Sequence, residues 1–68
     1  MIVVINGEET ELADGLFIKE LVEKLGLTPA RLAVEVNRKI IRKAEWDSTS
    51  LSDGDKVEIV HFVGGGLI

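Results

Sequence analysis

The sequence predicts an α+β fold in which one main helix packs across a mixed sheet of four to five strands. Short β-branched segments open and close the 68-residue chain, and one segment between them instead has the spacing of an amphipathic helix. The first and last segments, MIVVI and VEIVHFV, are continuously apolar, which is typical of strands inside a sheet. We therefore expect the two terminal strands to lie side by side.

The N-terminal part predicts a β-hairpin followed by the helix. Asn6-Gly7 comes directly after MIVVI and favours a type I′ turn, because both central residues of that turn need a positive φ. EETELA is expected to form the second strand, which Asp14-Gly15 ends. The helix is expected in LFIKELVEKLG, residues 16–26, where apolar residues recur along one stripe. These residues are Phe17, Ile18, Leu21, Val22 and Leu25. Gly26 suits a C-terminal cap.

The second half of the chain predicts three more strands. Thr28-Pro29 fits the cap and first position of one short turn, and AVEVN then alternates as a strand. Asn37-Arg38-Lys39 is interpreted as a turn into IIRK, which completes a second hairpin with basic residues at its tip. Asp53-Gly54-Asp55 predicts a tight turn before the last strand, after a brief extended piece near residues 50–52.

Together these elements form the β-grasp arrangement, the architecture of ubiquitin. We expect one β-grasp domain at residues 1–63 and a flexible C-terminal glycine tail at residues 64–68, with a two-residue extension after the glycines. A domain of this size buries only about 60% of its unfolded surface, so a deep cleft is not expected. The chain has no cysteine, which excludes disulfides, thiolate metal sites and a cysteine nucleophile.

Charge and hydropathy narrow the class of protein further. The formal net charge of −4 disfavours a general nucleic-acid binder, because non-specific affinity comes mainly from Lys and Arg. No apolar run approaches the 18 or so residues of a membrane span, and the start lacks the basic region of a signal peptide, so we expect a cytoplasmic protein that binds no membrane. Acidic residues cluster near the start, and basic residues cluster in the middle: Arg31, Arg38, Lys39, Arg42 and Lys43. Each cluster is either a solvated face or a contact for a charge-complementary protein.

Neither the single histidine nor the single tryptophan predicts a catalytic or metal site. His61 has no neighbouring ligand types at metal spacing and no partners for a catalytic triad. Trp46 is expected to be a partly buried anchor for the long loop, because basic and aromatic residues do not interleave around it. We therefore expect no catalytic residue and no bound metal or cofactor.

The last strand carries a candidate docking surface. Val57 and Ile59 alternate with Lys56 and Glu58, so parity places the two apolar side chains against the helix. The same alternation places Val60 and Phe62 on the open face, where two apolar side chains would form a docking patch. A covering loop, or a bulge that shifts the register, would instead bury them.

Gly64, Gly65 and Gly66 form the most distinctive motif of the chain. Phosphate-binding glycines lie between a strand and a helix, and nothing after Gly66 could form a helix, so a P-loop or Rossmann turn is excluded. Two interpretations remain: a frayed end, or a narrow tail that enters another enzyme's active site. There a terminal carboxylate could be adenylated with ATP, and a sulfur nucleophile could then displace AMP to leave a thiocarboxylate.

The motifs HFVGGG, DGDKVEIV, VNRKIIRKAEW and VVINGE together resemble the ThiS family of sulfur-carrier proteins in thiamine biosynthesis, over nearly the whole chain. The resemblance implies that the protein is a sulfur carrier and not an enzyme. It also implies that the carrier itself binds no cofactor. A ThiF-type enzyme would use ATP to adenylate Gly66, and the resulting thiocarboxylate would supply sulfur to a thiazole synthase (ThiG). Partner contacts are expected at Val60, Phe62, Arg38 and Arg42, and the carrier is expected to be a monomer when free.

The chain departs from the family pattern after the glycines. Gly66 is followed by Leu67 and Ile68, so its carboxyl group is held in a peptide bond. We therefore expect the bond between Gly66 and Leu67 to be a processing site, cleaved by a peptidase such as a zinc metalloprotease of the JAMM type.

Two other functions stay open at this stage. A carrier of the same fold could serve molybdopterin, cysteine or methionine synthesis, because the chemistry of its tail would be unchanged. A β-grasp domain could also be a binding module without carrier function, since a fold alone does not fix a function.

Overall fold

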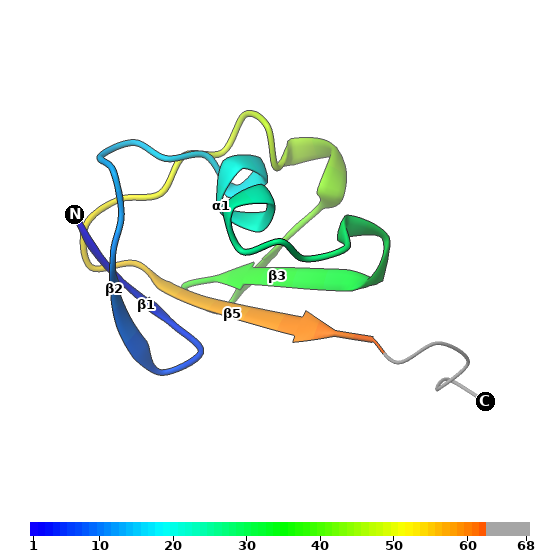
Figure 1. The fold of residues 1–68 in the computed structure, drawn as a ribbon, viewed down its shortest axis with the longest axis horizontal. Coiled ribbons are helices and arrows are strands. Elements are labelled where there is room, and N and C mark those ends of the chain that lie inside the picture. The colour runs from blue at the N-terminus through cyan, green and yellow to red at the C-terminus, as the bar shows by residue number, and fades with distance from the viewer. Residues whose placement is uncertain (63–68) are drawn as a thin grey trace.

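The computed structural model describes residues 1–62, which form a five-stranded mixed sheet with one α-helix across one face (Figure 1). The α+β class and the five-strand, one-helix architecture are confirmed. The strands are β1 (Ile2–Ile5), β2 (Glu8–Glu11), β3 (Leu32–Val36), β4 (Lys39–Ile41) and β5 (Lys56–His61). The helices are α1 (Ile18–Lys24) and two short 3₁₀ helices, η1 (Pro29–Arg31) and η2 (Lys43–Glu45).

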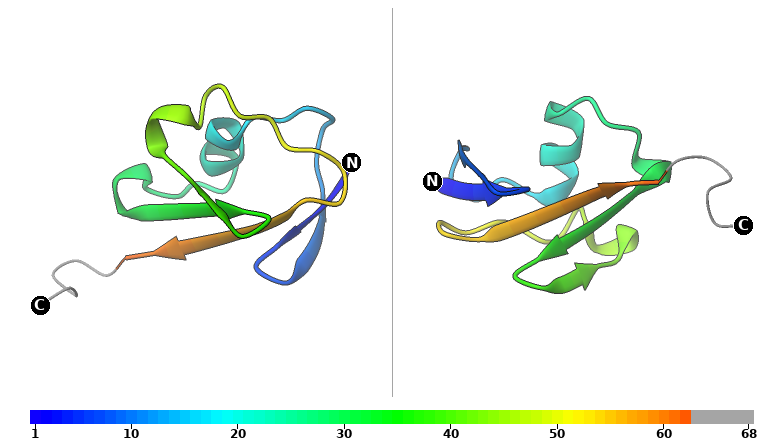
Figure 2. Two further views of the ribbon diagram at one scale, coloured as in Figure 1. Left: turned by 180° about the vertical axis from the view of Figure 1, so that it is seen from behind. Right: turned by 90° about the horizontal axis from the view of Figure 1, so that it is seen from below.

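The sheet has the order β2-β1-β5-β3-β4, so β5 is the central strand. β1 and β5 are parallel, with Val4 beside Lys56 and Ile5 beside Val57, whereas all other neighbours are antiparallel. The expected adjacency of the two terminal strands is therefore confirmed. Figure 2 shows β2 and β4 at opposite edges of the sheet.

Both hairpins turn through two residues with positive φ. Asn6 and Gly7 have φ values of 48° and 84°, as the predicted type I′ turn requires. Asn37 and Arg38 have φ values of 51° and 70°. The second turn is one residue shorter than predicted, because Lys39 already belongs to β4.

Helix α1 is shorter than the predicted segment 16–26 but ends as predicted. Its first turn is closed by the Phe17 N–H, which donates to the Glu20 carboxylate at 2.9 Å. At the other end Gly26 has a φ of 69°, and its N–H donates to the Glu23 carbonyl at 3.0 Å. The Leu27 N–H donates to the Val22 carbonyl at 3.3 Å, which completes a Schellman motif.

The core lies between α1 and the sheet. Its buried members are Val3, Leu12, Ile18, Leu21, Val22, Leu32, Val34, Trp46, Leu51 and Val57. The predicted helical stripe is buried only in its middle, because Phe17 and Leu25 cap the helix and stay partly exposed. Trp46 is 4% exposed, more buried than expected, and its Nε1 donates to the Ile41 carbonyl at 3.0 Å. The loop anchor that the sequence predicted is thus confirmed.

The extended piece expected near residues 50–52 is reduced to one bridge. Ser50 pairs with Phe17 in an isolated antiparallel bridge. The Leu51 N–H also donates to the Leu16 carbonyl at 2.8 Å, so these bonds fix the loop to the segment before α1.

Candidate partner-binding surface

Strand β5 presents its side chains alternately to the core and to the open face of the sheet. Val57 is buried and Ile59 packs against the core, whereas Val60 is 53% exposed and Phe62 is 46% exposed. The predicted parity is confirmed, so neither a covering loop nor a bulge in residues 1–62 buries the two exposed side chains.

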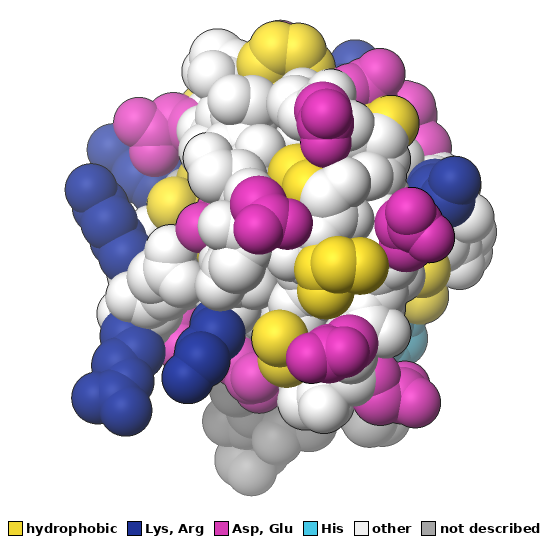
Figure 3. Space-filling model, turned by 90° about the vertical axis from the view of Figure 1, so that its left-hand side faces the viewer, with side chains coloured by type: hydrophobic (Ala, Val, Ile, Leu, Met, Phe, Trp, Pro, Cys, Tyr) yellow, Lys and Arg dark blue, Asp and Glu magenta, His cyan; other side chains and the backbone are white. Residues whose placement is uncertain are grey.

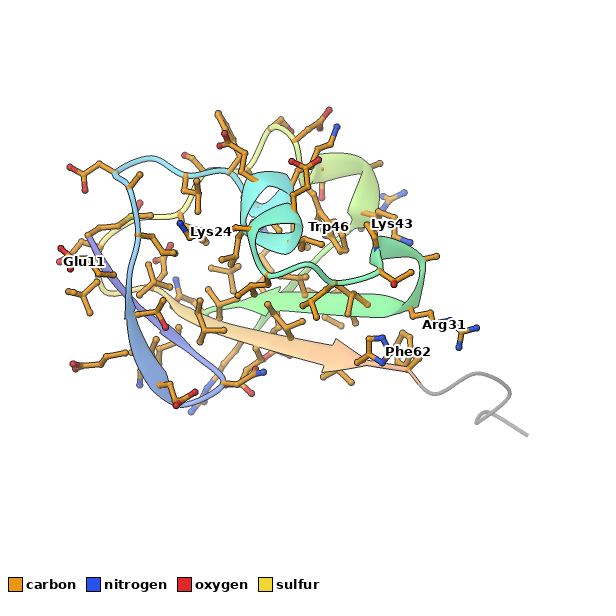
Figure 4. The ribbon with its side chains drawn as sticks, in the orientation of Figure 1. Glu11, Lys24, Arg31, Lys43, Trp46 and Phe62 are labelled. Carbon is orange, nitrogen blue, oxygen red and sulfur yellow. The ribbon has the colours of Figure 1, made fainter. Side chains whose placement is uncertain are left out.

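The register shows which residues surround Val60 and Phe62. Val60 lies beside Ala33 of β3, and the Phe62 N–H donates to the Arg31 carbonyl at 2.7 Å. Since Ile41 pairs with Val34, continuation of that register brings Arg42 next to Ala33. We call this group of Val60, Phe62, Ala33, Arg31 and Arg42 the β5-end patch. Figure 4 shows Phe62 and Arg31 at the C-terminal end of β5.

The predicted basic cluster is divided between the two ends of β5. The Asn37 N–H donates to the Lys56 carbonyl at 2.7 Å, so the hairpin tip with Arg38 lies at the beginning of β5. Phe62 follows the other end of the strand, about 20 Å from Lys56 at the usual rise per residue. The structure therefore brings Arg42 toward Val60 but does not bring Arg38 to the same patch.

Two glutamates lie next to each other in the middle of the open face of the sheet. Glu35 and Glu58 are direct cross-strand neighbours in the middle of that face, where like charges repel each other. Within residues 1–62 the only ion pair joins the Met1 ammonium to the Asp14 carboxylate at 3.0 Å. The hydrogen bond from the ammonium to Asp14 raises the pKa of the Met1 amine above its ordinary value of 8.0. The arginines of the β5-end patch therefore have no carboxylate partner in that part of the chain.

Sequence reasoning missed two members of the β5-end patch and one side chain that fixes the opposite end of β5. Ala33 and Arg31 belong to it only through the register of β3 against β5. Asn37 was interpreted as a turn residue, but its Oδ1 also accepts a hydrogen bond from the Lys56 N–H at 2.9 Å. Its Nδ2 donates to the Asp55 carboxylate at 3.0 Å. The Asx preference for turns was the only sequence signal for this role.

The glycine tail and the expected processing site lie outside the described residues. Gly64, Gly65, Gly66 and Leu67 all follow Phe62, the last residue that the structure describes. The structure therefore defines the strand and the surface that precede the tail.

A pocket of about 260 Å³ lies between α1 and η2, and apolar residues such as Val22 and Trp46 line it together with charged ones such as Lys19 and Asp47. Lys43 lies at its rim, with Nζ 5.8 Å from the centroid of the Trp46 ring. Residues 1–62 contain no group of three His, Cys, Asp or Glu side chains placed to hold a metal. Nor does any helix among them have the length and apolarity needed to cross a bilayer.

Comparison with known proteins gives the same family for sequence and structure. The model of the ThiS family matches residues 3–66, a range that includes all three glycines. The chain is 38% identical over 63 residues to the sulfur carrier protein ThiS of Bacillus subtilis, covering 91% of this chain and 96% of that protein. It is also similar to the crystal structure of ThiS from Geobacter metallireducens, with a TM-score of 0.84 and 33% identity, covering 97% of this chain and 100% of the other.

A second kind of relative is much longer than this chain. The chain is 41% identical over 66 residues to a thiazole synthase of Paramagnetospirillum magneticum, and these residues make up 97% of this chain. It spans only 20% of the length of that relative.

Proposed function

The chain belongs to the ThiS family, whose members are small sulfur carriers and not catalysts, and on that premise we propose that it carries sulfur on Gly66 for thiazole formation in thiamine biosynthesis. The observation that carries this proposal is the exposure of Val60 and Phe62 at the C-terminal end of the central strand, shortly before the glycines of the family match. An enzyme that binds this open face would have the tail at its contact surface.

The proposed chemistry has two steps on one carboxyl group. A ThiF-type enzyme binds ATP, and an oxygen of the Gly66 carboxylate attacks the α-phosphorus, which releases pyrophosphate and forms an acyl-adenylate. A sulfur donor at the oxidation level of sulfide then attacks the acyl carbon and expels AMP. The thiocarboxylate that results keeps one oxygen and gains one sulfur. Glycine suits this position because it has no side chain to obstruct a narrow channel.

Gly66 must first become a chain terminus. In the sequence its carboxyl group is bonded to the nitrogen of Leu67, so it has no carboxylate that could react with ATP. We propose that a peptidase, such as a metalloprotease of the JAMM type, hydrolyses this bond. Water supplies the hydroxyl of the new carboxylate and a proton to the released amine.

The proposed acceptor is a thiazole synthase of the ThiG type. The similarity to a segment of the longer relative named thiazole synthase supports this choice, because that relative contains a ThiS-like sequence. The ThiS family match likewise favours thiazole formation over the sulfur carriers for molybdopterin, cysteine or methionine.

Intact-mass spectrometry tests the proposal on two forms of the protein. The chain as printed and a form that ends at Gly66 are incubated with a ThiF-type enzyme, ATP and a sulfide source. We expect only the second form to gain the mass that results when sulfur replaces one oxygen, with release of pyrophosphate. A Gly66-ended form with Gly65→Leu is the control, and we expect it to stay folded but unmodified.

Two results would contradict separate parts of the proposal. An unmodified Gly66-ended form, in the presence of an activating enzyme that modifies the Bacillus subtilis ThiS, would contradict the carrier function. Modification of the uncleaved chain at Ile68 would contradict the need for cleavage.

A further inference from the structure

We propose that copies of this chain associate edge to edge, with β4 of one copy added as an antiparallel strand to β2 of the next. This inference rests on residues 1–62 and does not depend on sulfur transfer. It concerns the two sheet edges, which share only Arg42 with the β5-end patch, because Val60 and Phe62 lie on or just after the central strand β5.

Both edge strands have backbone groups that face away from the sheet. In residues 1–62, β2 pairs only with β1 and β4 only with β3. The Leu12 N–H donates to the Met1 carbonyl, so by alternation the backbone groups of Glu9 and Glu11 point outward from the β1–β2 ladder. The two-residue turn pairs Val36 with Lys39, so the N–H and carbonyl of Ile40 point outward from β4. Such rows of unpaired groups can accept another strand.

The two edges carry opposite charge. Three of the four residues of β2 are glutamates, Glu8, Glu9 and Glu11. β4 and the residues next to it provide Arg38, Lys39, Arg42 and Lys43. None of these side chains belongs to an ion pair within residues 1–62, where the Met1 contact is the only one. Figure 3 shows most of the Lys and Arg side chains in that view along its left side and others at the upper right, with Asp and Glu spread over the surface.

The charge pattern selects which edges can pair. Contact between two β2 edges would place glutamates opposite glutamates, and contact between two β4 edges would place cations opposite cations. Like charges directly across a strand pair are destabilising, whereas opposite charges contribute favourably. Only a contact between β4 of one copy and β2 of another places opposite charges across the strand pair.

Strand direction and side-chain parity agree with the same pairing. β4 runs parallel to β5 and therefore to β1, whereas β2 runs antiparallel to β1. If a second copy is placed beside the first as a continuation of the sheet, with its helix on the same side, β2 of the second copy runs antiparallel to β4 of the first. A register with Ile40 opposite Glu11 places Arg42 opposite Glu9, with all four side chains on the open face.

The association is expected to be weak and salt-dependent. One short strand pair buries far less area than a stable interface requires, so a dilute chain stays a monomer, as the sequence suggested. Because the contact is heterologous and each strand is twisted relative to its neighbour, successive copies form an open array. Val60 and Phe62 stay accessible in every copy, whereas Arg42 takes part in the contact.

Sedimentation velocity of the full chain tests the proposal over about a 100-fold range of concentration, in about 10 mM and about 0.5 M NaCl, where the screening lengths differ several-fold. We expect the average mass to rise with concentration in low salt and to return to that of the monomer in high salt. Concentration-independent monomer in low salt, or association that persists in high salt, would overturn the proposal.

Charge-reversed variants test which edges are used. Lys39→Glu with Arg42→Glu cancels the net positive charge of the β4 edge and sets a carboxylate opposite Glu9, and Glu9→Lys with Glu11→Lys makes the β2 edge basic, like the β4 edge. We expect each variant to be monomeric alone and a mixture of the two to associate. The control is Lys19→Glu with Lys24→Glu, which lowers the net charge by as much as Lys39→Glu with Arg42→Glu does but at positions on α1. This control should associate as the original chain does. If the mixture fails to associate, or if the α1 control also loses association, the edge model is wrong.

Disulfide cross-linking provides a second measurement, because the chain has no native cysteine. A mixture of Glu9→Cys and Arg42→Cys should form the mixed dimer several-fold faster than a mixture of Glu9→Cys and Lys24→Cys in low salt. Equal rates for the two mixtures would overturn the proposed pairing.

Discussion

The side-chain amide of Asn6 forms hydrogen bonds with both backbone polar groups of Ile59. The Asn6 Oδ1 accepts a hydrogen bond from the Ile59 N–H at 2.8 Å, and Nδ2 donates to the Ile59 carbonyl at 3.2 Å. Backbone pairing between β1 and β5 ends at Ile5 and Val57, so the side-chain amide continues the ladder where β1 turns away. The strand that leads to the glycine tail is thus fixed one residue before Val60.

Asn6→Gly should therefore loosen β5 without disturbing the turn. Glycine accepts the φ of 48° but cannot make the two side-chain bonds, so we expect a loss of about 1–2 kcal/mol in the free energy of unfolding. Amide hydrogen exchange measured by NMR should accelerate at Ile59. Asn37→Gly is the matched control: it removes the bond to Lys56 and should accelerate exchange at Lys56 instead. Unchanged protection of Ile59 in Asn6→Gly would contradict the anchoring role.

Val60→Asp and Phe62→Asp should weaken binding to a ThiF-type enzyme while the domain stays folded. Both side chains are about half exposed, so a carboxylate there costs little in the free chain but must lose water in an interface. We expect the Kd to rise by about tenfold or more, which corresponds to at least about 1.4 kcal/mol.

Leu25→Asp provides the control for this surface prediction. Leu25 is 44% exposed but caps α1 rather than lying on the open face of the sheet. Its substitution should leave the Kd measured by titration calorimetry within about twofold of the original value, as is usual outside a hot spot. Equal loss of binding in all three variants would contradict a docking surface on the β5-end patch.

Trp46→Phe should destabilise the fold through one lost hydrogen bond and a small cavity. The indole Nε1 donates to the Ile41 carbonyl, and the smaller ring cannot replace this donor. We expect the free energy of unfolding in urea to fall by about 1–3 kcal/mol. Lys43→Met removes the cation near the indole ring and should cost about 0.5–1 kcal/mol, the usual value of such a contact at an exposed site. A smaller effect for Trp46→Phe than for Lys43→Met would contradict the anchoring role of Trp46.

The parts of the fold that could be predicted depend on short-range patterns. The two-residue turn at Asn6-Gly7, the αL cap at Gly26 and the parity of β5 each follow from residues within a few positions of one another. The side on which Val60 and Phe62 lie was predictable for the same reason, since side chains alternate strictly along a strand.

The parts that sequence reasoning missed depend on long-range register. Asn6 and Ile59 are separated by 53 positions, so no local pattern reveals that their polar groups meet. Arg38 and Arg42 looked equivalent in one basic cluster, but they flank β4 at opposite ends, and only Arg42 lies toward Val60. Phe17 and Leu25 fit the helical stripe, yet the caps place them outside the helix.

Arg38→Gly should stabilise the protein, although it removes an exposed charge. Arg38 has a φ of 70°, and an L-residue with a side chain pays about 1–2 kcal/mol in this left-handed region. Glycine avoids that cost but loses more freedom on folding, about 0.5–1 kcal/mol, so we expect a net gain of about 0.5–1 kcal/mol. The urea midpoint should rise at unchanged m-value. Arg42→Gly is the control, because it removes the same charge at a φ of −65° and should lower the midpoint. If both variants lowered the midpoint equally, charge rather than backbone conformation would govern this hairpin.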